Sequence, residues 1–162
     1  MSVIILARAV HVLSGVIWAG FAIIVGLALV GVPAGETPHA ARHARRSMVN
    51  RGLRIVAPAA ILTLLSGAYL FSALHGGGGA PGEIALLLGA VSAVLALIVG
   101  AIGNGLPERR LAKLDETAAR TRLSPEMSAE VAALDRRVVF SARVTAALLI
   151  MSGLAMGVAR YL

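Results

Sequence analysis

The chain has 162 residues, of which 58% are hydrophobic and 14% are charged, and it contains no cysteine. A soluble domain is about half apolar and about a quarter charged, and a short chain has too much surface to hide a larger apolar share. The composition therefore excludes a soluble globular domain, a disordered chain and thiolate metal sites, and it predicts one integral membrane domain over residues 1–162.

Four apolar runs are each long enough to cross a bilayer as a helix, which takes about 20 residues. They cover about residues 3–32, 55–75, 84–106 and 138–160. The first run lacks the charged start of a signal peptide and exceeds its usual apolar length of about 7–15 residues, so we expect it to be retained. The sequence thus predicts an all-α fold, an integral membrane four-helix bundle.

The basic residues fall in two of the three connections between these runs. The first connection carries Arg42, Arg45, Arg46 and Arg51, and the third carries Arg109, Arg110, Lys113, Arg120, Arg122, Arg136 and Arg137. The middle connection, at residues 75–83, has no lysine or arginine. By the positive-inside rule, both basic connections are expected in the cytoplasm and both termini outside. We expect a multi-pass protein of a bacterial-type inner (cytoplasmic) membrane, with the lipid bilayer as its partner.

The net charge of +7 could also indicate a nucleic-acid-binding protein. Such proteins place aromatic residues among their cations for base stacking. Aromatic residues make up only 4% of this chain, and its arginines lie between apolar runs. The basic charge is therefore explained by membrane topology, and we expect no nucleic acid among the partners.

Helical signals extend beyond two of the apolar runs. Ser124-Pro125 is typical of a helix start, and apolar residues follow it at helical spacing: Met127, Val131, Leu134 and Val138. The fourth helix is therefore expected to begin in the cytoplasm and continue into the membrane. Leu111 and Leu114 indicate a similar extension of the third helix.

Three local signals interrupt or mark the spans. Pro58 is expected to bend the second helix. Asn104, which stands between two glycines, is interpreted as the end of the third helix. Gly153 and Gly157 form a GxxxG pattern in the fourth helix, which is typical of helix contacts and leaves self-association open.

The first span carries polar and small residues on one helical face. Arg8, His11, Gly15 and Trp18 follow one another at steps of three or four. Polar groups inside a bilayer tend to face the bundle interior, and neutral imidazole is a common metal ligand. This face predicts a pocket in which His11 is an axial ligand of haem iron, Trp18 shapes the pocket and Arg8 meets a propionate. The alternative is that His11 only forms a hydrogen bond with a neighbouring helix.

Three further residues are candidates for the same site. His75 ends the second span on the side where His11 lies, so the two could ligate one haem iron or one copper ion. The alternative is an interfacial histidine before a turn. Arg54 and Arg143 could each pair with an anionic group, such as a haem propionate or a lipid phosphate. The alternative for both is snorkelling to the membrane interface.

Two stretches of the chain also carry a family resemblance. The first is Arg8-Ala9-Val10-His11-Val12 with Ser14 and Ile17-Trp18-Ala19-Gly20, and the second is Met48, Arg51, Leu53-Arg54-Ile55, Pro58-Ala59, Ile61-Leu62-Thr63 and Gly67. They resemble the first two helices of HemJ-type protoporphyrinogen oxidases and of the related CopD-like (copper-resistance) membrane domains. The resemblance implies a four-helix membrane haem protein with His11 as candidate haem ligand, which oxidises protoporphyrinogen IX and passes electrons to quinone. The CopD-like members imply copper uptake or handling.

The third and fourth spans depart from the HemJ-type pattern. The third span lacks the lysine of that group, and Ala142-Arg143-Val144-Thr145 stands where the group has an Asn-Glu-Val-Pro-like stretch. We therefore expect a divergent member: an integral membrane protein that binds haem b and works in electron transfer or quinone-linked oxidation. The alternatives are a protoporphyrinogen IX oxidase, a copper carrier and an accessory subunit without cofactor. A quinone or a porphyrin is the expected small-molecule partner.

Overall fold

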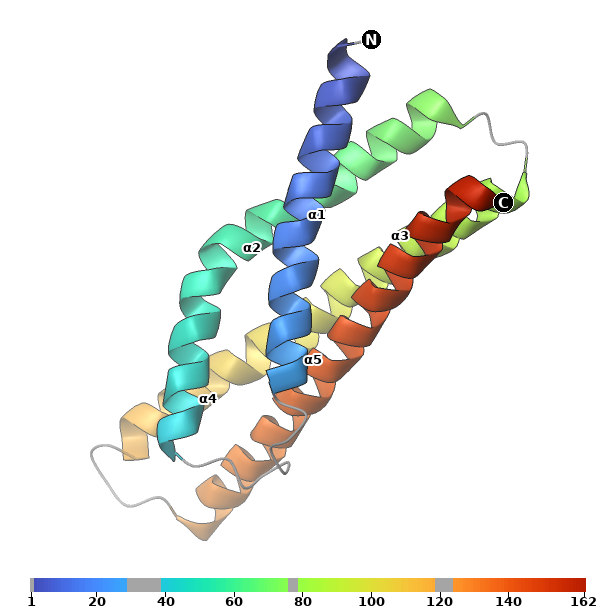
Figure 1. Ribbon diagram of the computed structural model, residues 1–162. Helices are drawn as coiled ribbons and strands as arrows, with labels where there is room; N and C mark the ends of the chain where they lie inside the picture. The colour runs from blue at the N-terminus through green and yellow to red at the C-terminus, as the bar shows by residue number, and fades with distance from the viewer. Residues whose placement is uncertain (1, 29–38, 76–78, 119–123) are drawn as a thin grey trace.

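The computed structural model describes residues 2–28, 39–75, 79–118 and 124–162, and these are almost entirely helical (Figure 1). The helices are α1 (Ser2–Ala28), α2 (His39–Leu74), α3 (Pro81–Gly100), α4 (Leu106–Ala118) and α5 (Pro125–Val158). A π-helical turn, η1 (Ala101–Gly105), joins α3 to α4, and a 3-10 turn, η2 (Ala159–Tyr161), follows α5. The side chains of residues 2, 28, 39–46, 48–50, 53 and 118 lie outside the described part.

Four helical segments are long and apolar enough to cross a membrane: Val3–Leu27, Arg54–Leu74, Pro81–Thr117 and Pro125–Tyr161. Large apolar side chains are exposed along all four, as a helix surface in contact with lipid requires. The predicted all-α bundle of four apolar helices is confirmed. Residues 29–32, the expected end of the first span, lie outside the described part, and the sidedness of the bundle stays a prediction.

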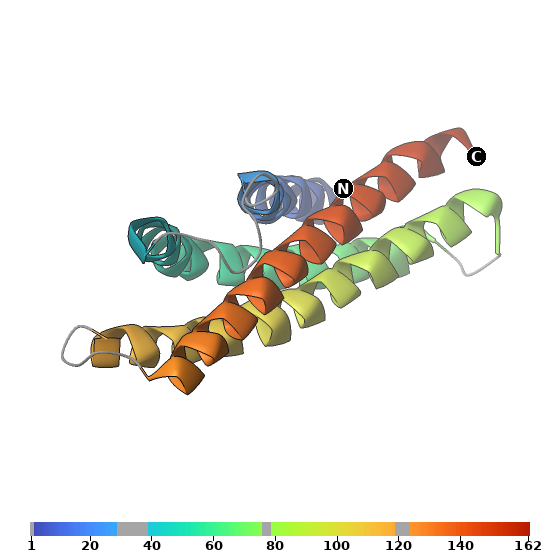
Figure 2. The same cartoon turned by 90° about the horizontal axis from the view of Figure 1, so that it is seen from below.

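The helices pack as two antiparallel pairs, α1 with α2 and α3 with α5. In both views α3 and α5 run side by side along most of their length (Figures 1 and 2). The first helix, α1, packs against both α2 and α5. Beyond its crossing with α2, the beginning of α1 and the end of α2 diverge (Figure 1).

The bend of α2 follows from its proline. Pro58 lies inside the helix, and Figure 1 shows α2 changing direction near its middle. A proline has no N–H to donate to the carbonyl four residues earlier, and its ring pushes that carbonyl aside. The predicted bend is confirmed, and it turns the second half of α2 across the face of α1.

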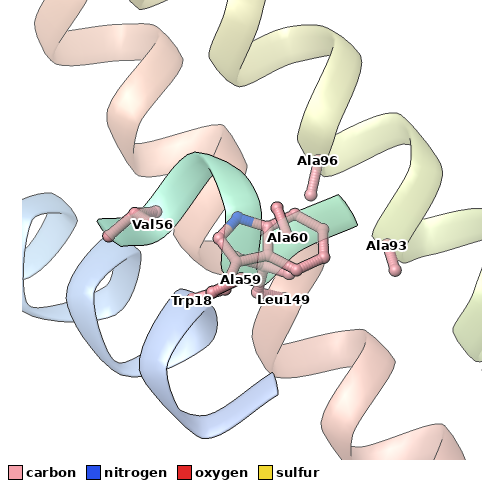
Figure 3. Close-up of a cluster of buried hydrophobic side chains, with 7 residues drawn as sticks. All are labelled: Trp18, Val56, Ala59, Ala60, Ala93, Ala96 and Leu149. Carbon is pink, nitrogen blue, oxygen red and sulfur yellow. The ribbon is translucent and has the colours of Figure 1, made fainter. Parts of the chain in front are cut away.

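Trp18 lies at the centre of the bundle, where α1, α2, α3 and α5 meet. Its side chain is 5% exposed and packs with Val56, Ala59, Ala60, Ala93, Ala96 and Leu149 (Figure 3). Alanines let the helix backbones approach closely around the one large ring. Trp18 therefore holds the helices together, and its indole is already enclosed by protein.

The close helix contacts use glycines other than those of the GxxxG pattern. A Cβ at Gly26 of α1 would lie 2.6 Å from the Cβ of Ala146 and 3.0 Å from the carbonyl oxygen of Ala142, both on α5. By contrast, a Cβ at Gly153 or Gly157 would meet nothing within 4 Å. The GxxxG pattern therefore makes no helix contact within the described part of the chain, because those two positions face outward.

The end predicted for the third helix at Asn104 is wrong. The helix passes through Asn104 as the π-turn η1 and continues as α4. At this turn the hydroxyl of Ser141 on α5 donates a 2.9 Å hydrogen bond to the carbonyl oxygen of Val99, and Gly103 leaves room for the Ser141 side chain. A helix that widens locally can direct a backbone carbonyl to a neighbouring helix, so the glycines serve packing and do not end the helix.

In α5, the predicted start at Ser124-Pro125 is confirmed. Pro125 occupies the first turn, and the Ser124 hydroxyl accepts a 3.3 Å hydrogen bond from the backbone N–H of Met127. The helix then runs unbroken to Val158. Its first half packs on α4 through the predicted apolar residues, with Leu111, Leu114, Val131 and Val138 buried together.

Candidate functional site

His11 lies between α1 and α2 with its ring held by the backbone of α2. Its Nδ1 is 2.9 Å from the carbonyl oxygen of Thr63. A carbonyl oxygen only accepts hydrogen bonds, so this contact assigns the proton of a neutral ring to Nδ1. The lone pair then resides on Nε2, for which the described residues provide no hydrogen-bond partner. His11 is thus half-buried, oriented and left with one available acceptor nitrogen.

Gly67 allows the ring to lie close against α2. A Cβ at this position would stand 2.8 Å from Cε1 and 3.2 Å from Nδ1 of His11. Contacts of that length between rigid atoms do not occur, so any side chain at residue 67 would move the imidazole. The hydroxyl of Ser66 lies 3.4 Å from the same Nδ1 and completes the polar surroundings of the ring.

A pair of hydroxyl groups joins α1 to α2 one turn further along. Thr63 Oγ1 donates to Ser14 Oγ at 2.8 Å, and Ser14 Oγ donates to the carbonyl of Val10 at 2.6 Å. Gly15 lies against the same residue, but a Cβ at that position would only be in ordinary contact with Thr63 at 3.6 Å, so the approach of the helices does not depend on glycine there. Interhelical hydrogen bonds and small residues fix helix pairs in lipid. The position of His11 against α2 is therefore set by its neighbours as well as by its own bond.

The structure keeps only part of the predicted site together. His11 and Gly15 both contact α2 within one turn of each other, while Arg8 is exposed one turn before His11. Trp18 lies about 10 Å further along α1 and is enclosed in the core, so it does not border the free nitrogen of His11. The wall beside the imidazole is formed by Ser66 and Gly67 instead.

The two candidate arginines lie away from His11. Arg143 follows Ala142, whose carbonyl contacts Gly26, and Gly26 is about 22 Å from His11 along α1. Arg54 lies between Gly52 and Val56, which pack on α1 about 10–15 Å beyond His11. Both arginines are exposed. The two arginines therefore do not form one site with His11, because the helix crossing places them nearer the other end of the bundle.

His75 is also not brought to His11. It lies about 12 Å beyond Gly67 along α2, and its ring stacks on Phe71 with centroids 5.4 Å apart. Its Nδ1 is buried and makes no hydrogen bond within the described residues. Among those residues, no group of three or more His, Cys, Asp or Glu side chains could hold a metal ion. The arrangement in which both histidines ligate one metal is not formed.

Sequence reasoning missed two sets of polar residues that lie between the helices. Thr63 and Ser66 contact His11. They are three residues apart along α2, which is one of the two helical steps, three or four, that separate the residues of the α1 face. Glu108 and Asp135 are 7% and 0% exposed, and both take part in further interactions within the chain. Asp135 shares a helical face with Val131 and Val138, which could have indicated its burial. A buried carboxylate must be compensated by interactions within the chain, as these two are.

Comparisons with known proteins do not assign the chain to a family. No family model, no curated protein and no solved structure matches the chain.

Proposed function

We propose that the chain binds one haem b in the membrane through His11 and works in electron transfer or quinone-linked oxidation. One observation carries the proposal: the ring donates from Nδ1 to the carbonyl of Thr63 and leaves Nε2 without a partner among the described residues. Histidines that ligate metal commonly donate their other ring nitrogen to a backbone carbonyl, which fixes the ring and raises its basicity. The resemblance of α1 and α2 to HemJ-type proteins supports the same role for His11.

The residues around Nε2 suit a flat, apolar group. Gly67 contributes no side chain beside the ring, and the half-buried Ile4 and Ala7 are apolar residues on the same face of α1 as His11. Arg8 precedes His11 by one turn on the same helix and is exposed, so a carboxylate near the membrane surface would find a cation there. Haem would supply one-electron redox chemistry, and the protein would tune it through the ligand and the apolar surroundings.

A copper site is supported less well. His75 could not ligate the same ion as His11, since it lies about 12 Å along α2 from Gly67, the residue against which the His11 ring lies. Copper sites use several nitrogen or sulfur ligands, whereas a single protein ligand suffices for haem, which supplies four nitrogens itself.

The separation of the histidines also predicts that the reduced haem protein keeps an open coordination position and binds carbon monoxide.

A haemin titration of the purified protein in detergent tests the proposal. We expect the Soret absorption of the bound form to rise and saturate at one haem per chain. Empty micelles of the same detergent are the control, because haemin also dissolves in them. A rise that never saturates, or that equals the rise in empty micelles, would contradict haem binding.

A further inference from the structure

The outward face of α5 combines cations with an exposed aromatic ring near the basic end of the bundle. Arg136, Phe140 and Arg143 follow one another at steps of four and three, and all three are exposed. Phe140 is the most exposed of them, at 70%. The opposite face of the same turns, with Val138, Val139 and Ala142, is buried against the other helices. This stripe is therefore turned away from the bundle, toward the membrane.

The direction of α5 carries the Arg143 side chain past Phe140 toward the level of the Arg136 backbone. Side chains on an α-helix lean toward its N-terminus, and α5 begins at the basic end. The Arg143 side chain therefore leans from the apolar zone toward Arg136, which lies about 10 Å nearer the helix start. Between the two, the Phe140 ring lies at the border of the apolar surface. The stripe thus carries two arginines and one aromatic ring on a single exposed face of α5.

The neighbouring helix α4 adds further positive charge at this level. Arg109 and Lys113 are exposed on it, while Arg110 is paired with Glu130 at 2.8 Å. The two buried carboxylates, Glu108 and Asp135, lie on the opposite, inner faces of α4 and α5. The exposed side chains at this level thus include the cations Arg109, Lys113, Arg136 and Arg143.

We infer that this stripe is a binding site for an anionic phospholipid, with its phosphate held by Arg136 and Arg143. Arginine suits phosphate because its planar group donates two parallel hydrogen bonds. Its five N–H donors leave capacity for a phosphate beside the contact that Arg143 makes within the chain. The acyl chain lies along Phe140, Met151 and Leu154, which are exposed further along the same face.

Lipid retention in mixed micelles tests the site. The protein is equilibrated with phosphatidylglycerol or phosphatidylcholine in detergent, re-purified, and its bound lipid is counted by mass spectrometry. Wild type is expected to retain the anionic lipid preferentially, and each of Arg136→Gln and Arg143→Gln is expected to reduce this retention about fivefold. Arg136→Gln alone keeps the test valid if the variant at residue 143 fails to fold.

The control variant is Arg160→Gln, since Arg160 is exposed at the opposite end of α5 beside Tyr161. It should retain the anionic lipid like wild type. Equal retention of both lipids by wild type, or unchanged retention in Arg136→Gln, would overturn the inference. Displacement of the lipid by millimolar inorganic phosphate would also overturn it, because the site would then bind a free anion and not a lipid.

Discussion

Replacement of His11 by alanine is expected to abolish haem binding. The variant removes Nε2, which the fold orients and for which the described residues provide no partner, together with the bond to Thr63. We expect haem affinity to fall on the order of 100-fold or more. Mutation of a group that only supports a metal ligand already lowers affinity by about 10–100-fold, and loss of the ligand itself should cost at least as much. The bound haem per chain, measured by absorption after gel filtration, checks this result. Loss of one hydrogen bond should cost only about 1 kcal/mol of stability, so the helices should persist.

His75→Ala is the matched control for this prediction. It removes the histidine that follows α2, which stacks on Phe71 about 12 Å from Gly67. Haem content and spectrum should equal those of wild type. If His75→Ala loses haem while His11→Ala keeps it, the assignment of the ligand is wrong. If neither variant changes haem binding, the proposed site is wrong altogether.

The second large effect is expected from Gly26→Leu, which should loosen the contact between α1 and α5. Its Cβ would meet the Cβ of Ala146 and the backbone of Ala142, and a backbone cannot rotate out of the way. Overpacking of this kind costs about 1–3 kcal/mol, occasionally more. A lower midpoint of thermal unfolding in detergent, followed by circular dichroism, is the measurement.

Gly153→Leu provides the comparison for Gly26→Leu. Both variants replace a helical glycine and gain about the same helix propensity, so the difference between them reports the packing contact. A Cβ at Gly153 meets nothing within 4 Å, and this variant should be as stable as wild type or slightly more so. Strong destabilisation by Gly153→Leu would show instead that the GxxxG face is covered, as in a self-associated form.

Local signals predicted most of the secondary structure. Long apolar runs located the four helices, the Ser124 cap located the start of α5, and Pro58 predicted the bend in α2. Asn104 misled because glycine and asparagine weaken a helix in water, whereas a helix in a packed bundle can continue through them as a π-turn. The stop signal lies in adjacent residues of the sequence, whereas the packing that overrides it depends on a distant helix, α5.

The candidate site was only partly predictable because it depends on how the helices cross. The periodicity of α1 placed His11, Gly15 and Trp18 on one face, and all three lie toward other helices. Nothing in the sequence specifies that residues 63–67 of α2 meet His11, or that the bend carries residue 75 away from it. Similarly, a GxxxG pattern indicates that a neighbouring helix can approach closely, but it does not indicate which helix does so.

The central claim, that Nε2 of His11 ligates the haem iron, is tested most directly by chemical rescue. His11→Gly leaves a space where the imidazole stood, and free imidazole can enter it. We predict that haemin-treated His11→Gly lacks the bound-haem spectrum, that added imidazole restores it, and that His11→Leu, in which the space is filled, shows no restoration. A helical His11→Gly protein that binds haem normally without imidazole, or that imidazole fails to restore, would contradict the account.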